Sequence, residues 1–244
     1  LGQISGKAEG TAHITITSEN RQTFVTRVEV GRDLSVRREK AVMMFTGDIM
    51  CAVKHQRLAY GHQHDYFDSF RRVRDILSGA DFTAGVLETT SIDRAPFEFE
   101  QLRLLTGAPN CNSPSTFISA VAAAGFNAVV TANNHNSDCG VEGLKAADSE
   151  IRRCGMLNIG SMGHSLVMTD VKGIKVAVIA TTMITNNTGW DLSKSGLVNP
   201  AGIYSRDYFT ELVNSARRMG AEFIAAYQHW GSMNSCLLYT SDAA

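Results

Sequence analysis

From Ala41 onward, apolar runs of strand length alternate with longer segments that carry helical spacing or loop residues, and few folds accommodate that alternation. The apolar runs read AVMMFT, FTAGVL, FNAVVT and AEFIAAYQ. Most of the connections between strands are too long for hairpins, so helices and loops must join these runs. We therefore predict an α/β protein in which a layered sheet is flanked by helices.

Residues that favour helix ends and turns mark where several of the predicted elements begin and end. Ser113 is expected to cap a helix that has Pro114 at its first position. Lys172 and Gly173 are expected to form a turn between two strands within residues 164–182. The predicted helices cover residues 65–79, 113–125, 141–155 and 205–220.

The two ends of the chain differ in character from its middle. Residues 11–30 predict a β-hairpin, which makes residues 1–40 an N-terminal β appendage or the end of a preceding domain. The main domain is expected to cover residues 41–235. Residues 236–244, CLLYTSDAA, resemble the translation of a sequencing-library adapter, so we leave them out of the fold prediction and treat the main domain as truncated.

Composition removes several classes of function. The 244 residues are 44% hydrophobic, enough for a substantial core, and the net charge of −1 gives no electrostatic basis for nucleic-acid binding. No apolar stretch approaches the roughly 20 residues of a membrane span, and no signal peptide is visible. The five cysteines form no CxxC pair and are expected to be buried or loop thiols.

Polar residues with ligand chemistry follow the carboxyl ends of four predicted strands. They are Asp48, Glu88, Asn134 with His135, and His229. In open α/β sheets, ligands bind beyond the carboxyl ends of the strands, so we expect these side chains to share one site. Their oxygen and nitrogen atoms suit one or two divalent cations such as Mn, Zn, Fe or Mg. A histidine beside such a centre can protonate a leaving group.

Each of these residues also has a simpler interpretation. Asp48 could cap a helix or turn, Glu88 could be a solvated loop acid, and His229 could be a core histidine beside Trp230. Asn133 and Asn134 could be turn formers. Asp138, followed by Gly140, is expected to cap the helix that begins near Val141 rather than to bind metal. The histidines of GHQHD, residues 61–65, are expected to lie in a solvated polar loop.

The motifs FTGDIM, VLET, ANNHNSDCG followed by EGL, and HWG resemble, in order and spacing, the CapA/PgsA family of bacterial capsule and poly-γ-glutamate synthesis proteins. The resemblance covers about Ala41 to Gly231. It implies a fold similar to that of calcineurin-like metallophosphoesterases. It also implies that Asp48, Glu88, Asn134 and His229 are metal ligands, with Glu88 in the bridging position, and that His135 is the catalytic or charge-stabilising histidine.

The chain departs from the family pattern at two points, and at a third from the metallophosphoesterase pattern, where the family itself commonly lacks the histidine. Val86 stands where the family usually has Asn, and Met50 offers no histidine ligand where metallophosphoesterases place one. A later segment similar to Gly-His-His-Pro-His, which completes the metal site in the family, is absent. The resemblance implies a hydrolase, whereas these departures predict that this fragment is inactive.

Three functions compete at this point. The first is a protein of capsule or poly-γ-glutamate synthesis with a metallophosphatase-like core that hydrolyses a phosphate ester or an amide. The second is a non-catalytic component that binds or exports a polyanion, and the third is a general metal-dependent phosphoesterase. The resemblance implies an anionic polymer or its precursor and other capsule-synthesis components as partners. It also implies a location at the cell surface, with membrane association only through a segment outside this chain.

Overall fold

The structure is a computed structural model that divides the chain into two compact units, residues 1–40 and 41–244. In the first unit, β1 (Gly10–Thr17) and β2 (Thr23–Val30) pair antiparallel, which confirms the predicted hairpin. The predicted turn after β1, the connector before Lys40, the histidines of GHQHD and the adapter-like tail lie outside the described residues. The structure describes residues 10–17, 23–30, 40–51, 56, 59, 65–93, 111–186 and 191–231.

The second unit contains a parallel four-stranded sheet in the order β3-β4-β5-β6. Its strands are β3 (Met43–Ile49), β4 (Phe82–Leu87), β5 (Ala128–Val130) and β6 (Leu157–Ile159). The strand β6 was not predicted, because a run of three residues is too short to show a period. The carboxyl ends of all four strands lie at the same edge of this sheet.

A second sheet has the order β7-β8-β9. In it, β7 (Leu166–Val171) and β8 (Ile174–Thr182) are antiparallel, and β9 (Phe223–His229) runs parallel to β8. The β7–β8 turn has positive φ at Lys172 (52°) and Gly173 (78°), which are the backbone angles that a tight two-residue hairpin requires. The turn predicted at these two residues is confirmed.

The two sheets pack face to face, so the predicted layered sheet consists of two stacked sheets. Ala84 and Val130 of the first sheet share a buried cluster with Val176 and Val178 of the second. The Tyr227 hydroxyl of β9 lies 3.0 Å from the carbonyl oxygens of both Thr46 and Ala84, which links the sheets through a polar contact. Because β8 is buried on both faces, it reads as a continuous apolar run.

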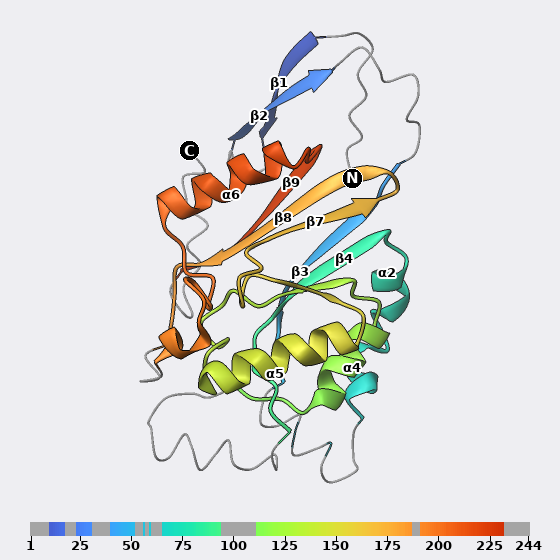
Figure 1. The fold of residues 1–244 in the computed structure, drawn as a ribbon. Helices are drawn as coiled ribbons and strands as arrows, with labels where there is room; N and C mark the ends of the chain where they lie inside the picture. The colour runs from blue at the N-terminus through green and yellow to red at the C-terminus, as the bar shows by residue number, and fades with distance from the viewer. Residues whose placement is uncertain are drawn as a thin grey trace. The chain divides into compact units, whose positions relative to one another are not determined.

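Helices cover the outer faces of both sheets (Figure 1). On the first sheet, α4 (Ser115–Ala123) and α5 (Gly140–Arg153) pack with the short η1 (Tyr66–Phe70) and α2 (Arg74–Ser78). On the second, α6 (Arg206–Arg218) packs against apolar side chains of β7, β8 and β9. The result is a four-layer arrangement, helix on sheet on sheet on helix, which confirms the predicted α/β class.

Two helix predictions need correction. The single helix expected over 65–79 is divided into η1 and α2, because Arg71 and Val73 donate their N–H groups three residues back. Ser113 does not cap α4, since its N–H and hydroxyl both donate to the carbonyl of Thr90 and Pro114 takes the N-cap position. A loop contact has therefore displaced the expected cap by one residue.

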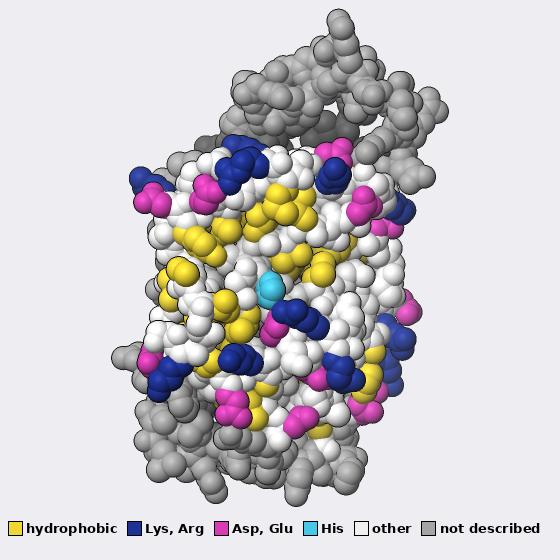
Figure 2. Space-filling view, in the orientation of Figure 1, with side chains coloured by type: hydrophobic (Ala, Val, Ile, Leu, Met, Phe, Trp, Pro, Cys, Tyr) yellow, Lys and Arg dark blue, Asp and Glu magenta, His cyan; other side chains and the backbone are white. Residues whose placement is uncertain are grey.

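The surface of the second unit mixes the two signs of charge on the face shown in Figure 2, where basic and acidic side chains alternate around apolar patches. Among the described residues of this unit, Arg152 forms a local ion pair with Asp148, and Arg218 forms one with Glu211. Within the described ranges, no helix combines the length and the apolar character needed to cross a membrane.

Gly160 packs against Ala132, the first residue of the segment ANNHNSDCG (residues 132–140), which we call the polar motif. This contact allows a stability prediction. The φ of Gly160 is 117°, and a Cβ there would lie 2.6 Å from both the Cβ and the backbone nitrogen of Ala132. Gly160→Ala should therefore lower the free energy of unfolding by about 3 kcal/mol through strain and overlap. Gly155 also has a positive φ, 77°, but a Cβ there would meet no atom within 4 Å. The control Gly155→Ala should therefore lower the free energy of unfolding by only about 1 kcal/mol. Urea titrations would compare them, and equal losses would contradict the packing argument.

Candidate functional site

The five site residues predicted from the sequence lie together at the carboxyl ends of their strands. Nδ1 of His229 lies 4.0 Å from Oδ1 of Asp48, and its Nε2 lies 3.9 Å from Oε1 of Glu88. The same His229 Nε2 lies 2.9 Å from Oδ1 of Asn134, and Nε2 of His135 lies 3.9 Å from Glu88 Oε1. The first sheet supplies four of these side chains and the second sheet supplies His229.

Local backbone geometry sets the position of the two carboxylates. The strand β3 continues past the expected end, and its register shifts between Thr46 and Asp48, so Gly47 is an extra residue at a bulge. Asp48 therefore extends from a strand and does not cap a helix. Glu88 follows β4 directly and is only 8% exposed, so its interpretation as a solvated loop acid is wrong.

Asn133 holds the polar motif against the neighbouring strand end. Its side chain is fully buried, with Nδ2 donating to the carbonyl of Leu87 at 2.9 Å and Oδ1 accepting from the backbone N–H of His135 at 3.0 Å. These bonds join the segment after β5 to the end of β4. Asn133 therefore does more than form a turn, because it fixes the spacing between Glu88 and His135.

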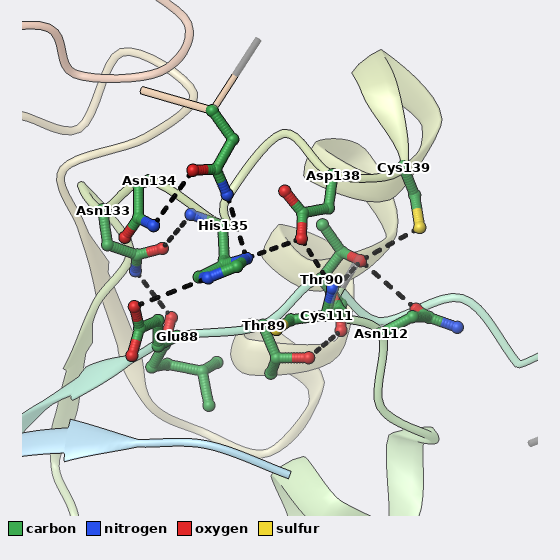
Figure 3. A network of polar contacts seen from close by, with 12 residues as sticks. Glu88, Thr89, Thr90, Cys111, Asn112, Asn133, Asn134, His135, Asp138 and Cys139 are labelled. Carbon is green, nitrogen blue, oxygen red and sulfur yellow. Dashed lines mark hydrogen bonds and ion pairs between the residues drawn. The ribbon is translucent and has the colours of Figure 1, made fainter. Parts of the chain in front are cut away.

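Asp138 belongs to the site, which corrects the prediction that it caps a helix. The N-cap of α5 is Cys139, while the buried Asp138 Oδ2 lies 2.7 Å from Nδ1 of His135 and accepts from the Cys111 backbone N–H at 2.5 Å (Figure 3). Because an ionised carboxylate only accepts, we assign the proton of the neutral imidazole to Nδ1, which leaves Nε2 facing Glu88. The i, i+3 spacing in HNSD was the available sequence signal.

Burial and clustered negative charge change the acid–base properties of the site. Burial, followed by the charge of Asp48 and then that of Asp138, raises the pKa of Glu88 to about 7, against an opposing effect of His135. Burial lowers the pKa of His135, but the hydrogen bond and charge of Asp138, together with the charges of Glu88 and Asp48, outweigh it and the net shift is upward. Burial is also the main cause of the lowered pKa of His229.

The donor set fits a divalent cation. Asp48 and Glu88 bring two carboxylates to one place, and their ion-pair partners in the described chain are His135 and His229. Asn134 adds a neutral carbonyl oxygen. Burial and then the charge of Asp48 raise the pKa of Glu88, and a bound cation would relieve the repulsion between the two carboxylates.

A second group of potential ligands overlaps this site. One ligand atom from each of Cys111, His135 and Asp138 lies within 4.8 Å of the others, and all three residues are buried. Metal binding by cysteine needs the thiolate. Burial, followed by the charges of Asp138 and Glu88, raises the pKa of the Cys111 thiol and disfavours that form. Asp138 Oδ2 already contacts His135 and the backbone of Cys111, so these three residues better explain how His135 is oriented.

Because the first group of ligands fits a cation better than the second, we predict that the Cys111 sulfur does not bind the metal. Cys111→Ser keeps the backbone N–H that donates to Asp138 and should leave the bound-metal content unchanged. Metal analysis of the purified variant would check this, with Cys154→Ser as a control away from the motif. Loss of the metal in Cys111→Ser alone would move the centre to the second group.

Sequence reasoning also missed Asn186, which lies after β8. Its Oδ1 accepts from Nδ2 of Asn134 at 3.2 Å, and its Nδ2 lies 3.2 Å from Nδ1 of His135. No periodic pattern or motif marks this position, because the contact joins residues 52 apart in the sequence.

The fold and the site define an α/β protein with an acidic, cation-compatible centre at the carboxyl ends of its strands. The sequence profile of the family described as bacterial capsule synthesis protein PGA_cap matches residues 42–236. The chain belongs to this family.

Individual relatives are more distant. The chain is 25% identical over 168 residues to the capsule biosynthesis protein CapA of Bacillus anthracis, covering 66% of this chain and 39% of that protein. It is 30% identical over 118 residues to the uncharacterized protein y4sH of Sinorhizobium fredii (strain NBRC 101917 / NGR234), covering 48% of this chain and 24% of that protein. The chain thus spans less than half the length of these relatives.

Two solved structures align with the chain at low similarity. A hypothetical protein from Thermus thermophilus aligns with a TM-score of 0.38 and 14% identity, covering 77% of this chain and 57% of that one. The NAD nucleotidase NadN of Haemophilus influenzae aligns with a TM-score of 0.38 and 15% identity, covering 68% of this chain and 32% of that one.

Proposed function

We propose that the protein acts in capsule synthesis as a metal-dependent hydrolase of a phosphate ester or an amide in an anionic polymer or its precursor. One observation carries this proposal. Two carboxylates, a carboxamide oxygen and an imidazole meet at the ends of separate strands, beside a buried histidine that is oriented by an aspartate. Asp48, Glu88, Asn134 and His229 would hold the cation. When bound, it would polarise the scissile group and activate water.

The protein's own groups supply the proton transfer. Asp138 orients His135 through Nδ1, so its Nε2 is the nitrogen that faces Glu88 and the cation ligands. In the protonated imidazolium, Nε2 can give a proton to the leaving oxygen or nitrogen. Asn133 keeps the backbone of His135 in place through its bond to the backbone N–H.

Family membership supports the proposed polymer and its location. Capsule polymers such as poly-γ-glutamate are polyanions, and a cation centre can receive an anionic group without placing it directly against Glu88 and Asp48. We propose that the complete protein acts at the cell surface together with other capsule-synthesis components. The similarity to the capsule biosynthesis protein CapA of Bacillus anthracis supports this placement.

Met50 gives one reason to keep a non-catalytic alternative. It stands two residues after Asp48, is 36% exposed, and contributes no nitrogen ligand. A centre with few ligands could hold a polyanion without hydrolysing it. A general phosphoesterase unrelated to capsule is the third candidate, and it requires the same centre.

Hydrolysis and binding assays on the protein expressed from the complete open reading frame separate these three functions. We expect Mn²⁺-dependent release of product from a capsule polymer or its precursor, and loss of that activity with EDTA. Polymer binding that survives EDTA, without turnover, would favour the non-catalytic alternative. Turnover of aryl phosphates alone would favour the general phosphoesterase. No bound metal and no turnover with any divalent cation would refute the proposal.

A further inference from the structure

Asn186 reaches the site from the second sheet and contacts two consecutive motif residues. Its backbone N–H donates to the carbonyl of Asn134 at 3.4 Å, in addition to the side-chain bond between their carboxamides. Its Nδ2 lies beside Nδ1 of His135. One residue after β8 therefore touches both the proposed metal-ligand amide and the proposed proton donor.

The orientation of the Asn134 carboxamide decides whether it can bind a cation. Its NH₂ group is occupied by Oδ1 of Asn186, so its oxygen faces Nε2 of His229 at 2.9 Å. A carboxamide oxygen is a cation ligand, whereas the NH₂ group is only a hydrogen-bond donor. Rotating this amide by half a turn would present NH₂ to the centre and remove one ligand.

Hydrogen bonding alone permits a second arrangement. If both carboxamides rotate, Oδ1 of Asn186 can accept from the Nδ1–H of His135, and Oδ1 of Asn134 accepts from Asn186 instead. The observed arrangement leaves the NH₂ of Asn186 beside an Nδ1 whose proton is directed at Asp138. The bond between Asn134 and Asn186 pairs an NH₂ group with an oxygen, so one amide cannot rotate without the other. Of the two arrangements, only the observed one offers the cation an oxygen of Asn134.

We propose that Asn186 is a positioning residue of the cation site, which fixes the carboxamide of Asn134 with its oxygen toward His229. This inference rests on the proposed function, because it gives Asn134 the role of a ligand. Asn186 acts only through Asn134 and does not bind the cation itself.

Substituting Asn186 in two ways tests this role. Asn186→Ala removes the acceptor and should weaken Mn²⁺ binding by about 10- to 100-fold, as for other residues that orient a ligand. Asn186→Asp can only accept, so Asn134 must still donate its NH₂ and keep its oxygen toward the cation. This variant should bind Mn²⁺ no more weakly than the wild type. In the described part of the chain, the Asn199 amide bonds to the backbone of Ile203, so the control Asn199→Ala should leave the affinity unchanged.

Isothermal titration of the metal-free chain with Mn²⁺ separates the outcomes. If the wild type binds no Mn²⁺, the proposed function fails before Asn186 is tested. If the wild type binds and Asn186→Ala stays within about threefold, or Asn186→Asp loses about tenfold, the positioning role is refuted. If Asn186→Ala does not fold, the Mn²⁺ affinity of Asn186→Asp alone tests the positioning role. The double variant Asn134→Ala/Asn186→Ala should bind no more weakly than Asn134→Ala, and additive losses would also refute the role.

Discussion

Replacing His135 with alanine is expected to lower turnover of the complete protein by about 10²- to 10⁴-fold, the range typical for loss of a general acid. The side chain of His135 is buried, is held by Asp138 at 2.7 Å, and directs Nε2 toward the carboxylate of Glu88. The fall should appear in kcat, because the imidazole contributes through proton transfer more than through substrate binding. Steady-state kinetics on the polymer and on an aryl phosphate would measure it.

Asp138→Asn and a distant histidine variant complete this experiment. Asp138→Asn replaces the carboxylate oxygens with one carbonyl and one NH₂ group, so His135 loses a reliable acceptor for Nδ1–H and kcat should fall while the protein stays folded. His164→Ala removes a half-exposed imidazole near Asp148 and should leave turnover unchanged. Equal activity in His135→Ala and His164→Ala would remove His135 from the mechanism.

Removing a direct ligand should have the largest effect on metal binding. Asp48→Ala and His229→Ala each delete a donor from the centre, and their Mn²⁺ affinity should fall by more than about 100-fold, since the loss exceeds that of a residue that only orients a ligand. Metal-free Asp48→Ala should unfold at a temperature close to that of the metal-free wild type, because the Asp48 side chain is 53% exposed. Metal-free His229→Ala should unfold at a lower temperature, because the His229 side chain is only 17% exposed and contacts Asn134 at 2.9 Å.

The controls for the ligand variants are residues of the same types that lie outside the centre. Asp207→Ala on the first turn of α6 and His164→Ala should bind Mn²⁺ like the wild type. Metal content after dialysis, measured by mass spectrometry, would show the difference. If Asp48→Ala and His229→Ala keep wild-type metal content, the cation lies elsewhere in the protein.

The sequence predicted the convergence of the five residues because each follows an apolar strand. A parallel strand places whatever follows it at a common edge, so Asp48, Glu88 and His135 needed no contact information to be grouped. The placement of His229 on a second sheet could not be predicted, because the apolar pattern of one segment does not show which strands it pairs with. The juxtaposition is present in the structure, whereas the roles of these residues remain predictions.

The contacts that complete the site depended on tertiary structure. Asp138 follows the pattern of a helix cap, but Cys139 is the N-cap of α5, and the Asp138 carboxylate contacts the Cys111 backbone and the His135 ring. Asn186 has no local signal, because its partner lies across the sheet interface. Local patterns thus identified the residues at strand ends, while the groups that orient them required the packed fold.

Anomalous diffraction from crystals grown with Mn²⁺ tests the cation centre most directly. The anomalous difference map should show a peak within ligand distance of Asp48, Glu88, Asn134 and His229. A peak bounded instead by Cys111 and Asp138, or crystals saturated with Mn²⁺ that show no peak between these four side chains, would contradict the assignment of the centre and the hydrolytic function built on it.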